Sequence, residues 1–228
     1  MKRTVLVGLV LFSLSIAQVY GMGINVSAFL PANGSLSHPV SPLSFRDVGF
    51  TVGKYAGVSG AIALNNINGM GLLDENKSPL RLTSPAVGPF YTALGSLMVK
   101  AILPVWRLNF EPGGGVFGYY LINPTLRSGV IDSYIAGKSG YQTVDSSFAI
   151  SNNWGWGFLA GGMISLAFDG KIGMQIGAYY YIGSSPLELT GTYRADGSSV
   201  ANPVPAYLKE VLLDFSGIEF IIGGTYEL

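Results

Sequence analysis

The chain has 228 residues, 13 basic and 13 acidic side chains, one histidine and no cysteine. This charge balance excludes the basic surface that displaces phosphate counterions, so we expect no nucleic-acid partner. Without cysteine, disulfides cannot stabilise the fold, and we expect no metal site and no cofactor. Charged residues are only 11% of the chain, against about 25% in a typical soluble domain. Together with 32 glycines and a mean hydropathy of +0.41, this composition favours lipid as the solvent for much of the folded chain.

The N-terminal segment has the pattern of a secretory signal peptide. Lys2 and Arg3 form a positive start, and an apolar run follows from Val5 to Ile16. Small residues at Ala17 and Gly21 offer two cleavage positions. The alternative is an uncleaved N-terminal anchor, for which the apolar run is short.

Large apolar side chains recur at every second position in several later segments, which is typical of strands with one apolar face. The clearest segments are Tyr91–Leu103, Trp106–Tyr120, Trp154–Phe168, Ile172–Tyr180 and Ile218–Leu228. Their ionisable side chains fall on the opposite parity, at Lys100, Arg107, Glu111, Lys171, Glu219 and Glu227. Because a charge facing the bilayer midplane costs about 2–4 kcal/mol, we interpret the apolar parity as facing lipid and the charged parity as facing a barrel interior. A helical membrane protein is the alternative, but glycines interrupt the longest uncharged stretch.

Short turns alternate with long polar loops along the chain. Asp169-Gly170 and the bend at Pro104 are short, whereas 122–153 and 183–210 are long. This asymmetry is typical of the two ends of an outer-membrane barrel. We therefore predict an all-β fold, an eight-stranded antiparallel up-and-down transmembrane β-barrel, over residues 22–228, after a signal peptide at 1–21. The predicted strands are Met22–Leu30, Phe45–Tyr55, Val58–Ile67, Val87–Leu103, Val105–Leu121, Trp154–Phe168, Lys171–Tyr181 and Leu212–Leu228.

Aromatic residues of the lipid-facing parity are predicted to form two girdles at the membrane interfaces. The girdle near the short turns comprises Trp106, Phe168 and Tyr226, and the girdle near the long loops comprises Tyr91, Tyr120, Trp156 and Tyr180. The run Gly113–Gly115 lies within a predicted strand, where we expect a bend or close inner packing.

The mature chain resembles the small eight-stranded outer-membrane barrels of the OmpA, OmpX and OmpW types. Its last strand is similar to the assembly signal of such barrels, with Gly223, Tyr226 and Leu228 at the glycine, penultimate aromatic and terminal hydrophobic positions. Two departures are a terminal leucine in place of the usual phenylalanine, and Ile221 where a polar residue is usual. The resemblance implies the outer membrane of a diderm bacterium, surface-exposed loops, and outer-membrane lipid and the barrel-insertion machinery as partners.

The inward parity predicts a lumen with two zones. The interior of an eight-stranded barrel is just wide enough for side chains to fill. The six inward charges predict either a salt-bridged plug or a gate whose pairs exchange partners, as the resemblance to the OmpA type allows. Nearer the long loops the inward residues become apolar, and they predict either ordinary packing or a ligand-binding funnel. These residues are Phe29, Phe90, Leu94, Phe117, Tyr119, Leu159, Tyr179 and Tyr181.

An apolar funnel above a polar floor is similar to the OmpW type, and this resemblance implies that small hydrophobic molecules pass sideways into the membrane. We therefore favour a porin-like role in transport, as a narrow channel or a binding funnel for small hydrophobic molecules. The alternative is a structural or adhesive barrel with a closed lumen, whose loops contact host components. Catalysis, such as lipid A editing, needs a nucleophile and an acid around a histidine. We expect His38, the single histidine, to be a solvated loop residue, and the protein not to be an enzyme.

Overall fold

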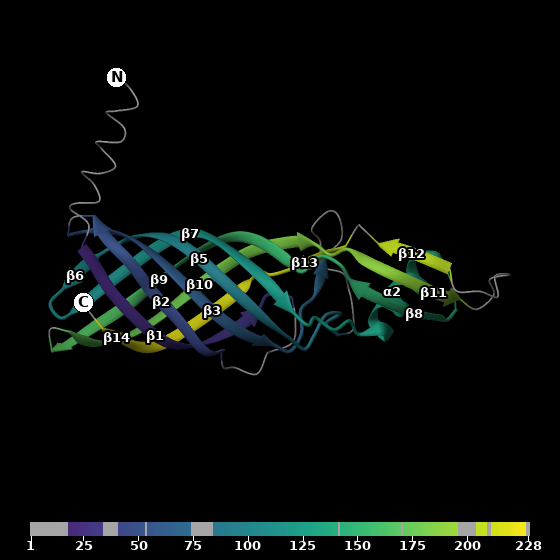
Figure 1. Cartoon of the computed structure of the whole chain (residues 1–228), viewed down its shortest axis with the longest axis horizontal. Helices are drawn as coiled ribbons and strands as arrows, with labels where there is room; N and C mark the ends of the chain where they lie inside the picture. Colours follow the sequence, from purple (N-terminus) through teal and green to yellow (C-terminus); the bar gives the residue numbers. More distant parts are fainter. Residues whose placement is uncertain are drawn as a thin grey trace, which may run out of the picture.

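Among the described residues, eight long strands form a closed antiparallel barrel in the computed structural model (Figure 1). The structure describes residues 18–33, 41–52, 54–73, 84–140, 142–169, 171–195, 204–208 and 211–226. The barrel strands are β1 (Gln18–Pro31), β2 (Ser41–Val52), β3 (Ala56–Ile67), β5 (Phe90–Ala101), β7 (Leu108–Ile122), β9 (Trp154–Asp169), β10 (Ile172–Pro186) and β14 (Gly217–Tyr226). Each strand pairs with the next, and β14 pairs with both β10 and β1, which closes the barrel. The predicted fold class is confirmed.

The alternation of side chains along the strands is the predicted one. On β7, Phe117 and Tyr119 are buried inside the barrel, whereas Val116 and Tyr120 are exposed on its outer wall. Leaving bulky apolar side chains on the outside is favourable only when lipid covers them. All seven aromatic residues of the two predicted girdles are also exposed, at Tyr91, Trp106, Tyr120, Trp156, Phe168, Tyr180 and Tyr226.

One irregularity in β2 reverses this alternation. The pairing of β2 with β3 shifts register between Phe45 and Val48, and both of these side chains are exposed. Arg46, which lies between them, is buried. A bulge of this kind turns a residue of the outward parity to the inner face. The strand thereby delivers a cation to the lumen that the parity analysis did not predict.

The last predicted strand, Leu212–Leu228, needs correction because it is two elements. A short strand β13 (Leu212–Asp214) pairs with the upper end of β10 and with β4 (Leu72–Leu73), and β14 begins only at Gly217. Between them the chain turns so that Phe215 enters the barrel mouth, where it is fully buried. At the opposite end, β6 (Leu103–Val105) continues the pairing of β7 into the short turn.

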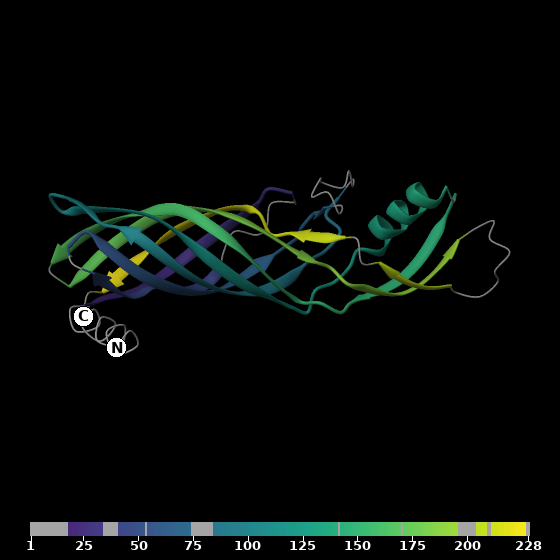
Figure 2. The ribbon, with the colours of Figure 1, turned by 90° about the horizontal axis from the view of Figure 1, so that it is seen from above.

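A small cap lies beyond the end of the barrel where the long loops are (Figure 2). Its three-stranded sheet has the order β12 (Val204–Leu208), β11 (Leu189–Ala195), β8 (Val144–Ile150), and helix α2 (Ser128–Ser139) packs against it. The sequence predicted these segments as parts of the long polar loops 122–153 and 183–210. No helix in the described ranges is long and apolar enough to cross a membrane.

Candidate functional site

The upper lumen, nearest the cap, is filled by one apolar cluster. All eight residues of the predicted funnel belong to it, and none is more than 6% exposed: Phe29, Phe90, Leu94, Phe117, Tyr119, Leu159, Tyr179 and Tyr181. They come from several different barrel strands, because inward positions at similar depth meet across a barrel. The structure thus brings the predicted set together, as a packed core rather than an open funnel.

Phe215 closes the top of this cluster. Its ring stacks on Tyr119 with centroids 4.2 Å apart and on Phe29 at 5.2 Å, and it lies 5.7 Å from Phe117. The Phe215 amide donates to the carbonyl of Gly183 on β10, at 2.8 Å. This ring was missed because it was assigned to a strand. The polar and glycine residues that flank it, Asp214 and Ser216-Gly217, are the signal that marks the break.

Below the aromatic rings, a buried ion pair joins β2 to β14 across the inner face of β1. Arg46 Nη2 donates to Glu219 Oε1 at 2.6 Å, and the Tyr181 hydroxyl donates to Glu219 Oε2 at 2.5 Å. The guanidinium also lies 5.9 Å from the centre of the Tyr179 ring. Arg46 and Glu219 are 1% and 0% exposed, so their mutual attraction is little screened by water. We call this set the Arg46 cluster.

A second ion pair lies on the neighbouring wall. Lys100 Nζ donates to Glu111 Oε2 at 2.6 Å, and the Ser165 hydroxyl donates to Glu111 Oε1 at 3.0 Å. Both ions are at most 5% exposed. Gly113 lets its strand pack closely against Lys100, because a Cβ at Gly113 would come within 3.0 Å of the Lys100 Cβ. Close inner packing at the Gly113–Gly115 run is therefore confirmed.

The inner face carries polar atoms beyond these pairs. Gln175 Nε2 donates to Asn25 Oδ1 at 2.5 Å. Arg46 Nε and Nη1 have no hydrogen-bond partner within the described part of the chain. The hydroxyls of Ser27, Ser59, Thr92 and Ser96 are likewise buried without one. The lower lumen is thus a closed but polar interior, in contrast to the apolar upper half.

Two residues of the predicted gate lie elsewhere. Arg107 and Lys171 are exposed in the short turns after β6 and before β10, and Arg107 lies over the Trp106 ring at 5.4 Å. Strand alternation ends where a chain turns, so parity did not place these two side chains correctly. The structure brings together Lys100, Glu111 and Glu219 as inner-face charges, with Arg46 as the cation that had not been predicted.

The remaining sequence predictions divide by where they fall. Gly223 and Tyr226 lie on β14, with the tyrosine exposed near its end. Glu227, Leu228 and His38 lie outside the described residues, as does the predicted signal peptide apart from its last positions. Within the described ranges, no three carboxylate or imidazole side chains gather as a metal site.

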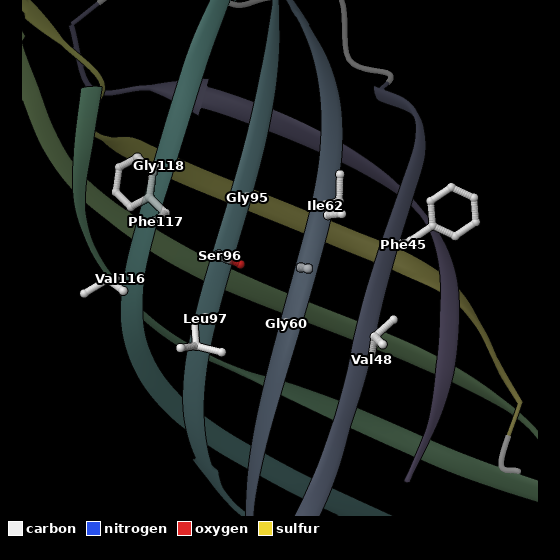
Figure 3. Close-up of a pocket in the computed structure, with 11 residues that line it drawn as sticks. Phe45, Val48, Gly60, Ile62, Gly95, Ser96, Leu97, Val116, Phe117 and Gly118 are labelled. Atoms are coloured by element: carbon white, nitrogen blue, oxygen red, sulfur yellow. The ribbon is translucent and has the colours of Figure 1, made fainter. Parts of the chain in front are cut away.

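The lipid-facing wall has a shallow hollow of about 560 Å³ across β2, β3, β5 and β7. Figure 3 shows side chains such as Val48, Leu97 and Val116 around Gly60 and Gly95, whose lack of a side chain makes the depression. Its lining holds no ionisable group. Such a hollow offers a largely apolar shape without ionisable groups to recognise a ligand, so we assign no functional site to it.

Comparisons with known proteins find similarity among solved structures only. No model of a known protein family matches the sequence, and no curated protein matches it. Among solved structures, the outer membrane protein OprG from Pseudomonas aeruginosa superposes with a TM-score of 0.54 at 12% identity, covering 92% of this chain and 97% of that one. A major outer membrane protein from Thermus thermophilus gives 0.46 at 11% identity, with 92% and 100% covered. Outer Membrane Protein W of E. coli gives 0.44 at 10% identity, with 92% and 99% covered.

The OprG comparison bears on the fold, which the closed strand order shows independently. Its identity is too low to transfer any activity. The chain has the fold of the small eight-stranded outer-membrane β-barrels.

Proposed function

We propose that this protein resides in a bacterial outer membrane and binds small hydrophobic molecules in the upper half of its barrel. The observation that supports the proposal is the origin of Phe215. This ring comes from the segment between β13 and β14, not from a barrel strand, and it packs on Phe29, Phe117 and Tyr119 at the top of the apolar cluster. A segment held by few strand pairings is displaced at lower free-energy cost than a barrel wall. A guest molecule of similar size takes the place of the ring.

The ion pairs below indicate where such a guest goes. The Arg46 cluster and the Lys100–Glu111 pair close the polar half of the lumen. Passing an apolar molecule between these ions would break charge-assisted hydrogen bonds without replacing them, which is unfavourable. Binding and release therefore take place at the cap end of the barrel, and not by axial passage to the short-turn end.

The methionines provide a direct test. Met70, Met98 and Met163 belong to the buried cluster, with Met70 at its cap end, whereas Met174 is exposed on the outer wall. In nanodiscs with labelled methionine methyls, titration with naphthalene should shift the Met70 resonance most, and those of Met98 and Met163 less, in saturable fashion. Met174 should change only with partitioning into lipid. Phe215→Ala should lower the half-saturation concentration by about tenfold, because a dry apolar cavity binds apolar guests.

A matched control is Phe158→Ala, which removes the same ring from the outer wall, where it is 57% exposed. This variant should titrate as the unmodified protein does. If the inner methyls stay unmoved in both the unmodified protein and Phe215→Ala, the binding role is wrong and the closed barrel is structural.

A second role is favoured by the cap. Helix α2 and the sheet β12-β11-β8 form an ordered unit outside the barrel wall, more than connectors require. We propose that it contacts host components. Replacing 125–151 and 188–210 by short glycine-serine links should abolish cell binding while the methionine shifts persist. Loss of both together would instead indicate that the barrel mouth had been damaged.

A further inference from the structure

A second groove opens on the outer wall just above the start of β14. β14 starts at Gly217, paired with Pro31 of β1 and Tyr181 of β10, but β10 continues to Pro186. The groove occupies the gap above, with a volume of about 470 Å³, and we call it the Asp214 groove. It lies outside the barrel wall and does not depend on the proposed lumen function.

The polar end of the Asp214 groove contains a buried carboxylate. Asp214 is 3% exposed. Its Oδ2 accepts from Asn33 Nδ2 at 2.5 Å, and its Oδ1 accepts from the Ser216 amide at 3.1 Å. Both donors are neutral, and the described residues place no cation within ion-pair distance. A carboxylate has about four acceptor positions, so further donors are accommodated.

The other wall of the groove is apolar and faces lipid. Phe158 and Ile182 line it and are 57% and 58% exposed on the outer parity. Trp156 and Tyr180, two members of the upper aromatic girdle, also line it. Girdle aromatics lie at the level of lipid headgroups. The groove therefore places a negative site beside a hydrocarbon surface. It does so at the depth where a lipid changes from charged headgroup to acyl chain.

We propose that the Asp214 groove binds an amine-headed lipid of the surrounding leaflet. Its ammonium donates to Asp214, and one acyl chain lies along Phe158 and Ile182. An ammonium carries three donors and a charge opposite to that of the carboxylate, so it compensates the burial of Asp214 as no neutral headgroup does. A quaternary headgroup carries the same charge but lacks donors, and it should bind weakly.

The tryptophans report occupancy. Trp156 lines the groove, whereas Trp106 and Trp154 do not. With the full chain in detergent micelles, dihexanoyl phosphatidylethanolamine should shift the Trp156 indole N–H resonance. Dihexanoyl phosphatidylcholine should need at least a fivefold higher concentration to give the same shift. Asp214→Asn should remove this preference, while Asp145→Asn on the cap, an exposed carboxylate, should keep it.

Variant folding is checked by the shift in gel mobility on heating. Should Asp214→Asn fail to fold, Ile182→Trp on the lipid-facing wall should fill the groove and abolish the response to both lipids. Equal affinities for the two lipids, or an unchanged preference in Asp214→Asn, would overturn the proposal. A shift of the Trp156 resonance with free hexylamine, but none with the ethanolamine lipid, would also overturn the proposal.

Discussion

At the scale of single residues, the Arg46 cluster is costly to disturb. Two full charges are removed from water, and the Tyr181 hydroxyl completes the coordination of Glu219. Removing one partner of a buried pair leaves an uncompensated charge. Replacing both partners by neutral polar side chains leaves no charge buried in the lumen. The loss of unfolding free energy therefore depends on whether one charge remains there without its partner.

The first prediction follows from this asymmetry. Glu219→Gln should lower the free energy of unfolding by about 3–5 kcal/mol, because the Arg46 charge then stays buried without its carboxylate. Arg46→Gln combined with Glu219→Gln should cost clearly less than the single Glu219 change. Urea unfolding in detergent, followed by tryptophan fluorescence, measures both.

An exposed charge serves as the control. Lys171→Gln at the short turn should change the unfolding free energy by less than about 0.5 kcal/mol. If Glu219→Gln is equally mild, the buried ion pair does not stabilise the folded barrel.

The sequence predicted the inner charges of β5, β7 and β14 because each lies in an unbroken run of alternation. It did not predict Arg46, since the bulge between Phe45 and Val48 exchanges the two faces of β2. Nor did it predict which charge pairs with which, because partners depend on strand stagger, which a one-dimensional pattern does not encode.

At the scale of elements, β9 and β10 pack closely through a pair of glycines. Gly157 and Gly183 are directly paired across the two strands, and the Phe117 ring lies against both from inside. A Cβ at Gly183 would come within 2.7 Å of Phe117 Cζ. Phe117 itself lies between Tyr181 and Phe215, with ring centroids 4.9 and 5.7 Å away. The missing side chains therefore make room for the aromatic cluster.

The second prediction is that Gly183→Ala destabilises the barrel by about 1–3 kcal/mol, through overpacking of this cluster. The matched control is Gly95→Ala on β5, where a Cβ meets nothing within 4 Å. That change should be neutral or stabilise by about 0.4–1 kcal/mol. Thermal unfolding, read from heat-dependent gel mobility, orders the two variants. The reverse order would contradict the packing described here.

The barrel strands were predictable because lipid on one side and a narrow lumen on the other enforce a strict period of two. The cap obeys no such constraint. Helix α2 contains glycine and serine, which disfavour helices. Its signal was nevertheless present, since Val130-Ile131 and Tyr134-Ile135 recur four residues apart and pack on one face. In a long polar loop that short pattern did not outweigh the low helix propensity.

At the scale of the whole molecule, the exposed apolar wall lies between two different ends. The short turns, such as the one that follows β6, form one end, and the cap forms the other (Figure 1). β10 runs the whole distance between them, with Ile176 exposed on its outer face. A barrel inserted in an outer membrane has its long loops outside the cell and its short turns in the periplasm.

The third prediction tests this placement in cells, since the chain has no cysteine of its own. A membrane-impermeant maleimide should label Ser147→Cys, on the exposed face of β8, in intact cells. Lys171→Cys should be labelled only after the outer membrane is permeabilised. Ile176→Cys should react only once the protein is denatured, because hydrocarbon surrounds it and thiolates form only in water. Labelling of Lys171→Cys in intact cells would reverse the orientation, and ready labelling of Ile176→Cys in native membranes would show that lipid does not cover the wall.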